Sequence, residues 1–186
     1  DSSKLANDIV QNQLTEAALV QPLSRPTPLV DRLKAKASEG MEPLPLYLEA
    51  VDSLTNGFGV PLDAARPLAV ESVMAGVASK GLNDNLSPSE VGRRALEAGT
   101  AVGMSPLEAS KIASKVAVDV VTADLASRNK PRSELIEAAT DAAEGAGATP
   151  IDARVIGEIG VNKATDPRRV DTSKYDVANP TPTGDP

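Results

Sequence analysis

The chain has 186 residues, enough for one domain of ordinary size, and it contains no cysteine, histidine or tryptophan. These absences exclude disulfide bonds, Fe–S clusters, thiolate or imidazole metal sites and a Ser/His/Asp triad, so we expect no metal and no cofactor. The formal net charge is −7, from 19 Lys and Arg against 26 Asp and Glu. Because a nucleic acid backbone is also negative, no nucleic-acid partner is expected.

The apolar content is aliphatic and small. Hydrophobic residues make up 41% of the chain and aromatic residues only 2%, and alanine is the commonest residue. Alanine has the highest helix propensity and lets helix backbones approach closely. No stretch without a charged residue is longer than ten residues, the length of Ser53 to Leu62, which is far shorter than the roughly 20 residues of a membrane-spanning helix. The composition predicts an all-α protein with a thin core and no transmembrane segment.

Residues 1–40 are predicted to form an N-terminal helical pair joined by a linker. The segment Ser3 to Val20 carries one apolar face, made of Leu5, Ile9, Val10, Leu14, Ala17 and Ala18. Pro22 to Thr27 is the linker. Pro28 to Ser38 predicts a short helix stopped by Gly40, since glycine readily adopts the left-handed conformation that ends a helix.

Two interleaved series of prolines recur with one period. The intervals are 45 and 43 residues in Pro43, Pro88 and Pro131, and 45 and 44 residues in Pro61, Pro106 and Pro150. In the second series each proline opens a Pro-Leu/Ile-Asp/Glu-Ala motif. A glycine, namely Gly59, Gly103 or Gly147, lies within four residues before it. Proline favours the first position of a helix. The pattern predicts three helical hairpins of about 44 residues, 41–86, 87–129 and 130–161, which make residues 41–161 a short α-solenoid or a stacked helical bundle.

Three of the predicted helix starts carry capping residues. The pairs place a hydroxyl three residues before a carboxylate: Ser87 with Glu90, Ser105 with Glu108, and Thr149 with Asp152. In such a capping box the hydroxyl accepts a hydrogen bond from the third helical N–H, and the carboxylate accepts one from the capping residue's N–H. We therefore interpret these six residues as helix caps.

The helix interiors show a 3.6-residue period. We predict buried stripes at Val91, Ala95, Ala98, Gly99 and Val102, at Leu107, Ile112, Ala113, Val116, Val120 and Ala123, and at Leu135, Ala138, Ala139, Ala142 and Ala146. The first hairpin is less regular, because Pro67 would interrupt a helix. There we expect a turn over residues 61–66, a helix over residues 67–79 and a loop over residues 80–86.

Residues 162–186 are predicted to be an extended docking tail. The tail holds four prolines and few apolar residues, so it lacks the means to form a core of its own. Its expected partner contacts are Tyr175, flanked by Val170 and Val177, and the paired arginines Arg168 and Arg169. An aromatic ring supplies a large contact area at low entropic cost.

No group of residues points to catalysis. The acidic residues lie mainly at caps or on hydrophilic helix faces, and a calcium loop starting at Asn83 would need an acidic residue where Arg94 stands. We therefore expect a non-catalytic structural or interaction subunit of a larger assembly, such as a respiratory or photosynthetic complex, a virion or a filament. Its partners would be other protein subunits.

Two alternatives remain open at the level of sequence. One is a helical carrier of a small apolar or pigment-like ligand, and the other is a free adaptor that binds peptides in a groove. The chain begins at Asp1 rather than Met, which favours a processed precursor that is exported, imported into an organelle or matured in a virion.

Enlarging the small residues of the predicted stripes should destabilise the fold. Replacing Ala95, Ala98 or Ala142 by Leu is expected to overpack the helix contacts and lower the free energy of unfolding by about 1–3 kcal/mol. Urea denaturation followed by circular dichroism measures the change. The control Lys111→Leu, on the hydrophilic side of its helix, should change the free energy of unfolding by less than about 0.5 kcal/mol. An equal loss in the control and in the Ala→Leu variants would contradict the assigned faces.

Overall fold

The structure is a computed structural model that describes residues 27–166, and this range contains helices and no strands. In chain order the elements are α2 (Thr27–Ser38), α3 (Pro43–Asp52), the π-helical turn η1 (Ser53–Gly57), α4 (Leu62–Asn83), α5 (Pro88–Ala101), α6 (Pro106–Ser127), α7 (Arg132–Gly145) and α8 (Pro150–Thr165). The all-α prediction is confirmed for the described residues. The helix expected over Ser3 to Val20 lies outside them.

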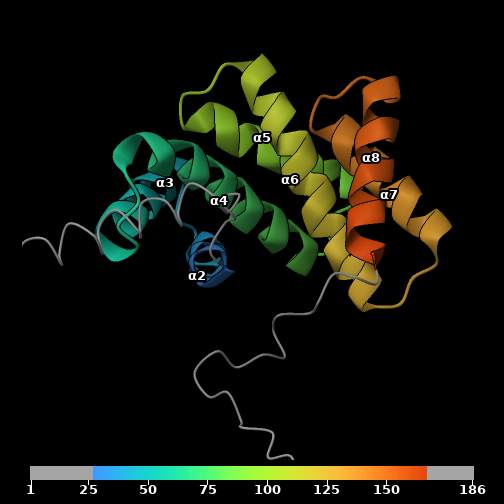
Figure 1. Cartoon of the computed structure of the whole chain (residues 1–186), viewed down its shortest axis with the longest axis horizontal. Helices are drawn as coiled ribbons and strands as arrows, with labels where there is room; N and C mark the ends of the chain where they lie inside the picture. Colours follow the sequence, from blue (N-terminus) through green and yellow to red (C-terminus); the bar gives the residue numbers. More distant parts are fainter. Residues whose placement is uncertain (1–26, 167–186) are drawn as a thin grey trace, which may run out of the picture.

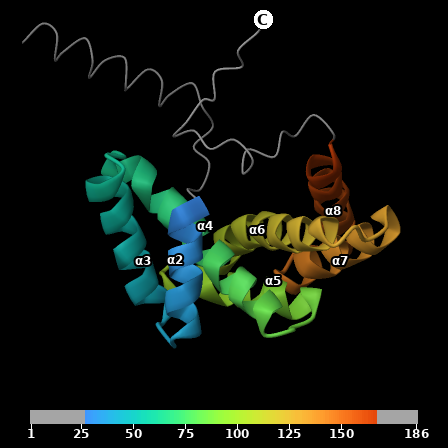
Figure 2. The same cartoon turned by 90° about the horizontal axis from the view of Figure 1, so that it is seen from below.

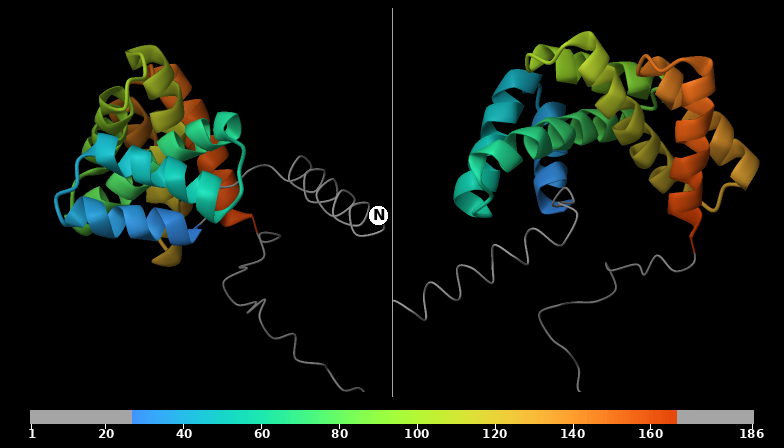
Figure 3. Two further views of the ribbon diagram at one scale, coloured as in Figure 1. Left: turned by 90° about the vertical axis from the view of Figure 1, so that its left-hand side faces the viewer. Right: turned by 45° about the horizontal axis from the view of Figure 1, so that its top comes forward.

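The helices follow one another across the molecule in nearly their chain order. Helices α2 and α3 lie towards one end and α7 and α8 at the other, with α4, α5 and α6 between them (Figure 1, Figure 2). Each helix from α4 to α8 packs against the next, and α4, α6 and α8 also pack in succession (Figure 3). The two ends of this arrangement are therefore formed by different helices, α3 and α8.

Prolines start most of the helices at the predicted place. Pro43, Pro88, Pro106 and Pro150 are the first residues of α3, α5, α6 and α8. Pro61 and Pro131 differ, because they are extended residues that precede α4 and α7 as N-caps, with φ/ψ of −56°/142° and −64°/150°. Proline fits either place, since its fixed φ suits both conformations and its missing N–H is not needed there.

Left-handed residues end the helices. Gly103 and Gly147, with φ of 97° and 91°, end α5 and α7, and Gly40 ends α2 in the same way. Asn85 and Asn129 take the equivalent place after α4 and α6, with φ of 57° and 54°. Asparagine is one of the few other residues that tolerate this conformation, so from α4 to α7 the stops alternate between asparagine and glycine.

Helix α4 corrects the expectation of a break at Pro67. The helix runs unbroken from Leu62 to Asn83, with Pro67 inside it, and residues 80–83 are helical rather than part of a loop. Proline removes the bond that residue 67 would donate to the carbonyl of Asp63. Both residues are exposed, so water can satisfy that carbonyl, while burial of Ala65, Leu68 and the residues that follow holds the helix together.

The stripe predicted for α6 is partly wrong. Leu107 and Ala123 are exposed, whereas Ala109, Ala117, Val118 and Val121 are buried. Helix α6 packs against α4, α5, α7 and α8, so it buries more than one face and a single-stripe pattern does not describe it. The stripes predicted for α5 and α7 are confirmed as buried or half-buried residues.

The end of α8 also differs from the prediction. The expected tail begins at Asn162, but the helix continues to Thr165. Lys163 pairs with Asp119 of α6 at 3.2 Å, and Arg132 of α7 donates to the side-chain oxygen of Asn162 at 2.5 Å. These contacts tie the last turn of α8 to the neighbouring helices, and the chain from residue 167 onward lies outside the described residues.

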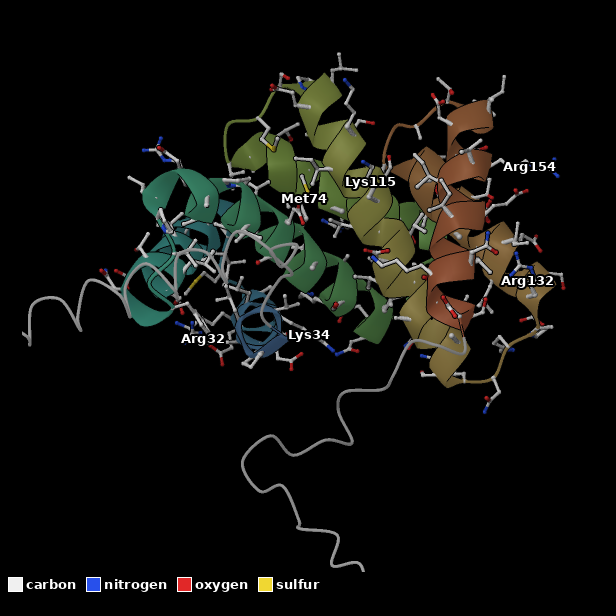
Figure 4. The ribbon with its side chains drawn as sticks, viewed as in Figure 1. Arg32, Lys34, Met74, Lys115, Arg132 and Arg154 are labelled. Carbon is white, nitrogen blue, oxygen red and sulfur yellow. The ribbon has the colours of Figure 1, made fainter. Side chains whose placement is uncertain are left out.

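The core is assembled mainly from small side chains. Alanine is the commonest residue among the buried apolar positions of residues 27–166, and Met74, fully buried in α4, is one of the few large unbranched side chains there (Figure 4). Small side chains contribute little area each, so the stability of the core depends on how closely the helices approach.

The closest approach is between α5 and α7. A Cβ atom on Gly92 would lie 1.9 Å from the carbonyl oxygen of Ala142, and one on Gly145 would lie 1.9 Å from the carbonyl oxygen of Ser89. Both obstacles are backbone atoms, so no side-chain rotation can relieve the overlap. Glycine is required at both positions for the two helices to cross as they do.

No helix within residues 27–166 combines the length and the apolar character that a membrane span requires.

The α5–α7 crossing predicts a large effect for a single methyl group. Gly92→Ala or Gly145→Ala should lower the free energy of unfolding by about 1–3 kcal/mol or more, because the helices must move apart. Chemical denaturation monitored by circular dichroism tests this.

Gly81→Ala is the matched control for this prediction. Gly81 is also a buried helical glycine, but its added Cβ would meet side-chain atoms at 3.4 Å, an ordinary contact. Alanine there should be neutral or stabilising by up to about 1 kcal/mol through its helix propensity. Equal destabilisation of all three variants would refute the crossing as the cause.

Candidate interaction surfaces

The residues interpreted as caps stand at helix starts. Ser87, Ser105 and Thr149 are the N-cap residues of α5, α6 and α8, and each side-chain oxygen accepts from the backbone N–H three residues later. Only Ser87 forms the full reciprocal box, in which its own N–H donates to Glu90 at 3.2 Å. The other two hydroxyls donate to their carboxylates, Ser105 to Glu108 at 2.6 Å and Thr149 to Asp152 at 2.8 Å.

The residues predicted to contact a partner are not among those described. Arg168, Arg169, Val170, Tyr175 and Val177 all lie outside residues 27–166. Their assignment as partner-binding residues stays a prediction.

Helix α8 carries a row of exposed large apolar side chains. Ile151, Val155 and Ile159, hereafter the α8 row, are 80%, 53% and 62% exposed. With 3.6 residues per turn they lie on the side opposite the buried Ala153, Gly157, Gly160 and Val161. Figure 4 shows the neighbouring Arg154 at the outer edge of the molecule. The row was not predicted from the sequence, although its four-residue spacing was a visible signal.

A second exposed row lies at the other end of the molecule. Leu44, Leu48 and Val51, hereafter the α3 row, are spaced by four and three residues; Leu44 and Leu48 are 49% and 60% exposed, and Val51 is half-buried. The opposite side of α3 buries Leu46 and Ala50 in the core. The helix is therefore apolar on two sides but covered on one.

The residue after each motif proline is also exposed. Leu62, Leu107 and Ile151 occupy the same motif position at the starts of α4, α6 and α8, and all three are exposed large hydrophobics. These three residues therefore contribute little to the core, and single exposed apolar residues such as Leu107 are common on protein surfaces.

A shallow cleft of about 400 Å³ opens between the α2–α3 connection, the end of α4 and α5. Its lining includes the Lys80–Asp84 ion pair and the Arg94–Glu97 pair, whose nitrogen and oxygen are 3.7 Å apart. Met41 and Val77 supply apolar area. This mixed, charged lining suits a small polar molecule better than an apolar one.

Buried polar side chains have structural partners. The hydroxyls of Ser72, Ser114 and Thr122 donate to backbone carbonyls four residues earlier at 2.6–2.7 Å. Within residues 27–166 no group of three or more acidic side chains is placed to hold a metal ion. The chemically distinctive feature of the described residues is thus the apolar surface at the two ends.

Comparison with known proteins returned no match, whether with family models, curated proteins or solved structures.

The capping geometry predicts a measurable stability change. Ser87→Ala should lower the free energy of unfolding by about 0.5–2 kcal/mol, since the N–H of Glu90 loses its acceptor at the start of α5. The control Ser89→Ala changes an exposed serine of the same turn that is not the N-cap. Thermal and urea unfolding measure both, and a Ser89 variant as destabilised as the Ser87 variant would contradict the cap assignment.

Proposed function

We propose that the protein is a non-catalytic structural subunit of a larger protein assembly and that it binds neighbouring subunits through an exposed face of its helices, the α8 row, and through the arm that follows α8. The observation that carries the proposal is an inversion of the usual distribution of apolar residues. The core buries mainly alanine, while Ile151 and Ile159 of the α8 row are largely exposed. Clusters of exposed large apolar side chains mark sites of protein association.

The α8 row has the form of a helix-packing surface. Residues four apart make a ridge that fits the groove of another helix. Arg154 and Glu158 flank the row and are joined by an ion pair of 3.3 Å, so the charged side chains beside it already have partners. An apolar helix of a partner would bury the row without also removing an unpaired charge from water.

The helix pairs α3–α4, α5–α6 and α7–α8 are proposed to be three units of a stacked repeat. Two contacts between α6 and α8 support this stacking, because each joins residues separated by about one repeat of 44 residues. Lys163 pairs with Asp119, 44 positions earlier, and Gly160 lies against Val118, 42 positions earlier. Stacked units leave an extended surface for binding, which is the use that other helical repeats make of this arrangement. Residues 41–161 would be the repeat domain.

The absence of catalysis is part of the proposal and rests on composition, since the chain has neither histidine nor cysteine. The settings that fit are a respiratory or photosynthetic complex, a virion or a filament. The arm that follows α8, with Tyr175, Val170, Val177, Arg168 and Arg169, is proposed as a further contact with neighbouring subunits. A carrier of an apolar ligand is the weaker alternative, because a chain without histidine and with 2% aromatic residues offers few specific ligand anchors.

Association of the full chain tests the proposal. Sedimentation velocity should give a mass above the 19.2 kDa of one chain. Ile151→Asp with Ile159→Asp should return the protein to a monomer with unchanged helical content, because two buried carboxylates would oppose association.

The control is Leu107→Asp, which changes an equally exposed apolar residue outside the α8 row and should leave the mass unchanged. A second variant that ends at Asp166 keeps all of α8 and removes only the proposed arm. A stable monomer at every concentration for the full chain, with no change on removing the arm, would contradict the proposal.

A further inference from the structure

The α3 row is unlike the surface of an ordinary end helix. The sequence of α3, Pro43 to Asp52, contains only two charged residues, Glu49 and Asp52. Glu49 is engaged by Lys36 of α2 at 2.6 Å. A helix that is apolar on both sides is normally buried on both sides, yet one side of α3 is open. Phe58 and Leu62, at the C-terminal end of α3, add two more exposed apolar side chains.

The contacts between α2 and α3 locate the start of α2. Lys36 reaches Glu49, and Arg32, one turn earlier in α2, donates to the hydroxyl of Ser53 at 2.6 Å. The two helices therefore run antiparallel, as Figure 2 also shows. Continuing this register, the first residue of α2, Thr27, lies at the C-terminal end of α3, where Phe58 is exposed.

The chain that precedes Thr27 has the length and pattern to cover this surface. As a helix, residues 3–20 place Val10, Leu14, Ala17 and Ala18 within about 100° of arc on one face, and Leu5 and Ile9 lie beside that face. As a helix they would be about 27 Å long, more than the length of α3. Residues 21–26 would join this helix to α2 and span at most about 20 Å. A helix that turned back at this linker would run along α3 from its C-terminal end.

We propose that residues 3–20 form an amphipathic helix that packs on the α3 row of the same chain. Its apolar face would bury Leu44, Leu48 and Val51, and α3 would then be covered on both sides. The short linker favours this intramolecular contact, because it holds the segment near α3 at an effective concentration of about millimolar. The α8 row lies at the opposite end of the molecule (Figure 1) and is not within the same reach.

Thiol labelling tests the contact, because the chain contains no cysteine and one introduced cysteine is a unique reporter. Leu48→Cys places the thiol in the α3 row, and Leu107→Cys places one at a site of similar exposure on α6. In the full chain the thiol at residue 48 should react with a maleimide at least about tenfold more slowly than the thiol at residue 107, because it reacts only when the covering helix opens.

Substitutions in residues 3–20 distinguish protection by this segment from other causes of slow labelling at residue 48. Val10→Asp, Leu14→Asp and Ala17→Asp together place charges on the apolar face and should bring the two labelling rates to within about twofold. The matched control adds the same three charges to the polar face through Gln11→Asp, Asn12→Asp and Thr15→Asp, and it should keep the protection.

Two results would overturn the inference. Equal labelling rates for Leu48→Cys and Leu107→Cys in the otherwise unchanged chain would show that nothing covers the α3 row. Protection that grows between about 1 and about 100 µM protein would show that a second copy covers it, since an intramolecular contact does not depend on concentration. Neither result bears on association through the α8 row, which is measured separately.

Discussion

The crossing of α5 and α7 is the constraint on which the rest of the packing depends. At Gly92 and Gly145 the backbone of one helix lies where a Cβ atom of the other would have to be, so the two helices meet backbone to backbone. The same helices bury Ala95, Ala139 and Ala142, whose size matches so close an approach. Larger residues at these places would separate the helices and with them the elements that pack on either side, α4, α6 and α8.

Close packing of small residues has a consequence for the surface. Alanine and glycine fill the space between helices without using the larger aliphatic residues, and several of those residues lie on the outside instead. They are concentrated where the series of helices ends, on α3 and on α8. Both end helices are apolar on a covered side and on an open side, the pattern of a helix that is buried on both. The fold therefore has two faces at which further helices would add to the core.

Helix starts and stops were predictable from the sequence because they depend on local chemistry. Ser87, Ser105 and Gly103 act within one turn of chain, so their spacing is sufficient to identify them. The continuous α4 and the double-sided burial of α6 were not predictable in this way, because they depend on which helices surround them. Pro67 is tolerated through burial of neighbouring residues, and Leu107 fits a stripe that the neighbours of α6 do not cover.

The candidate surfaces also combine features that the sequence predicts with features that only packing decides. The two ends differ in the segment of chain that adjoins them. The spacing of Ile151, Val155 and Ile159 was readable, but only the packing of α8 shows which of its two apolar sides is open. At the α3 end, the preceding residues 3–20 contain six large apolar residues, Leu5, Ile9, Val10, Leu14, Leu19 and Val20. The segment after α8 has only three large apolar residues, Val170, Tyr175 and Val177, among several prolines. Because that segment offers too little apolar area to bury the α8 row, a neighbouring subunit is the better source of its cover.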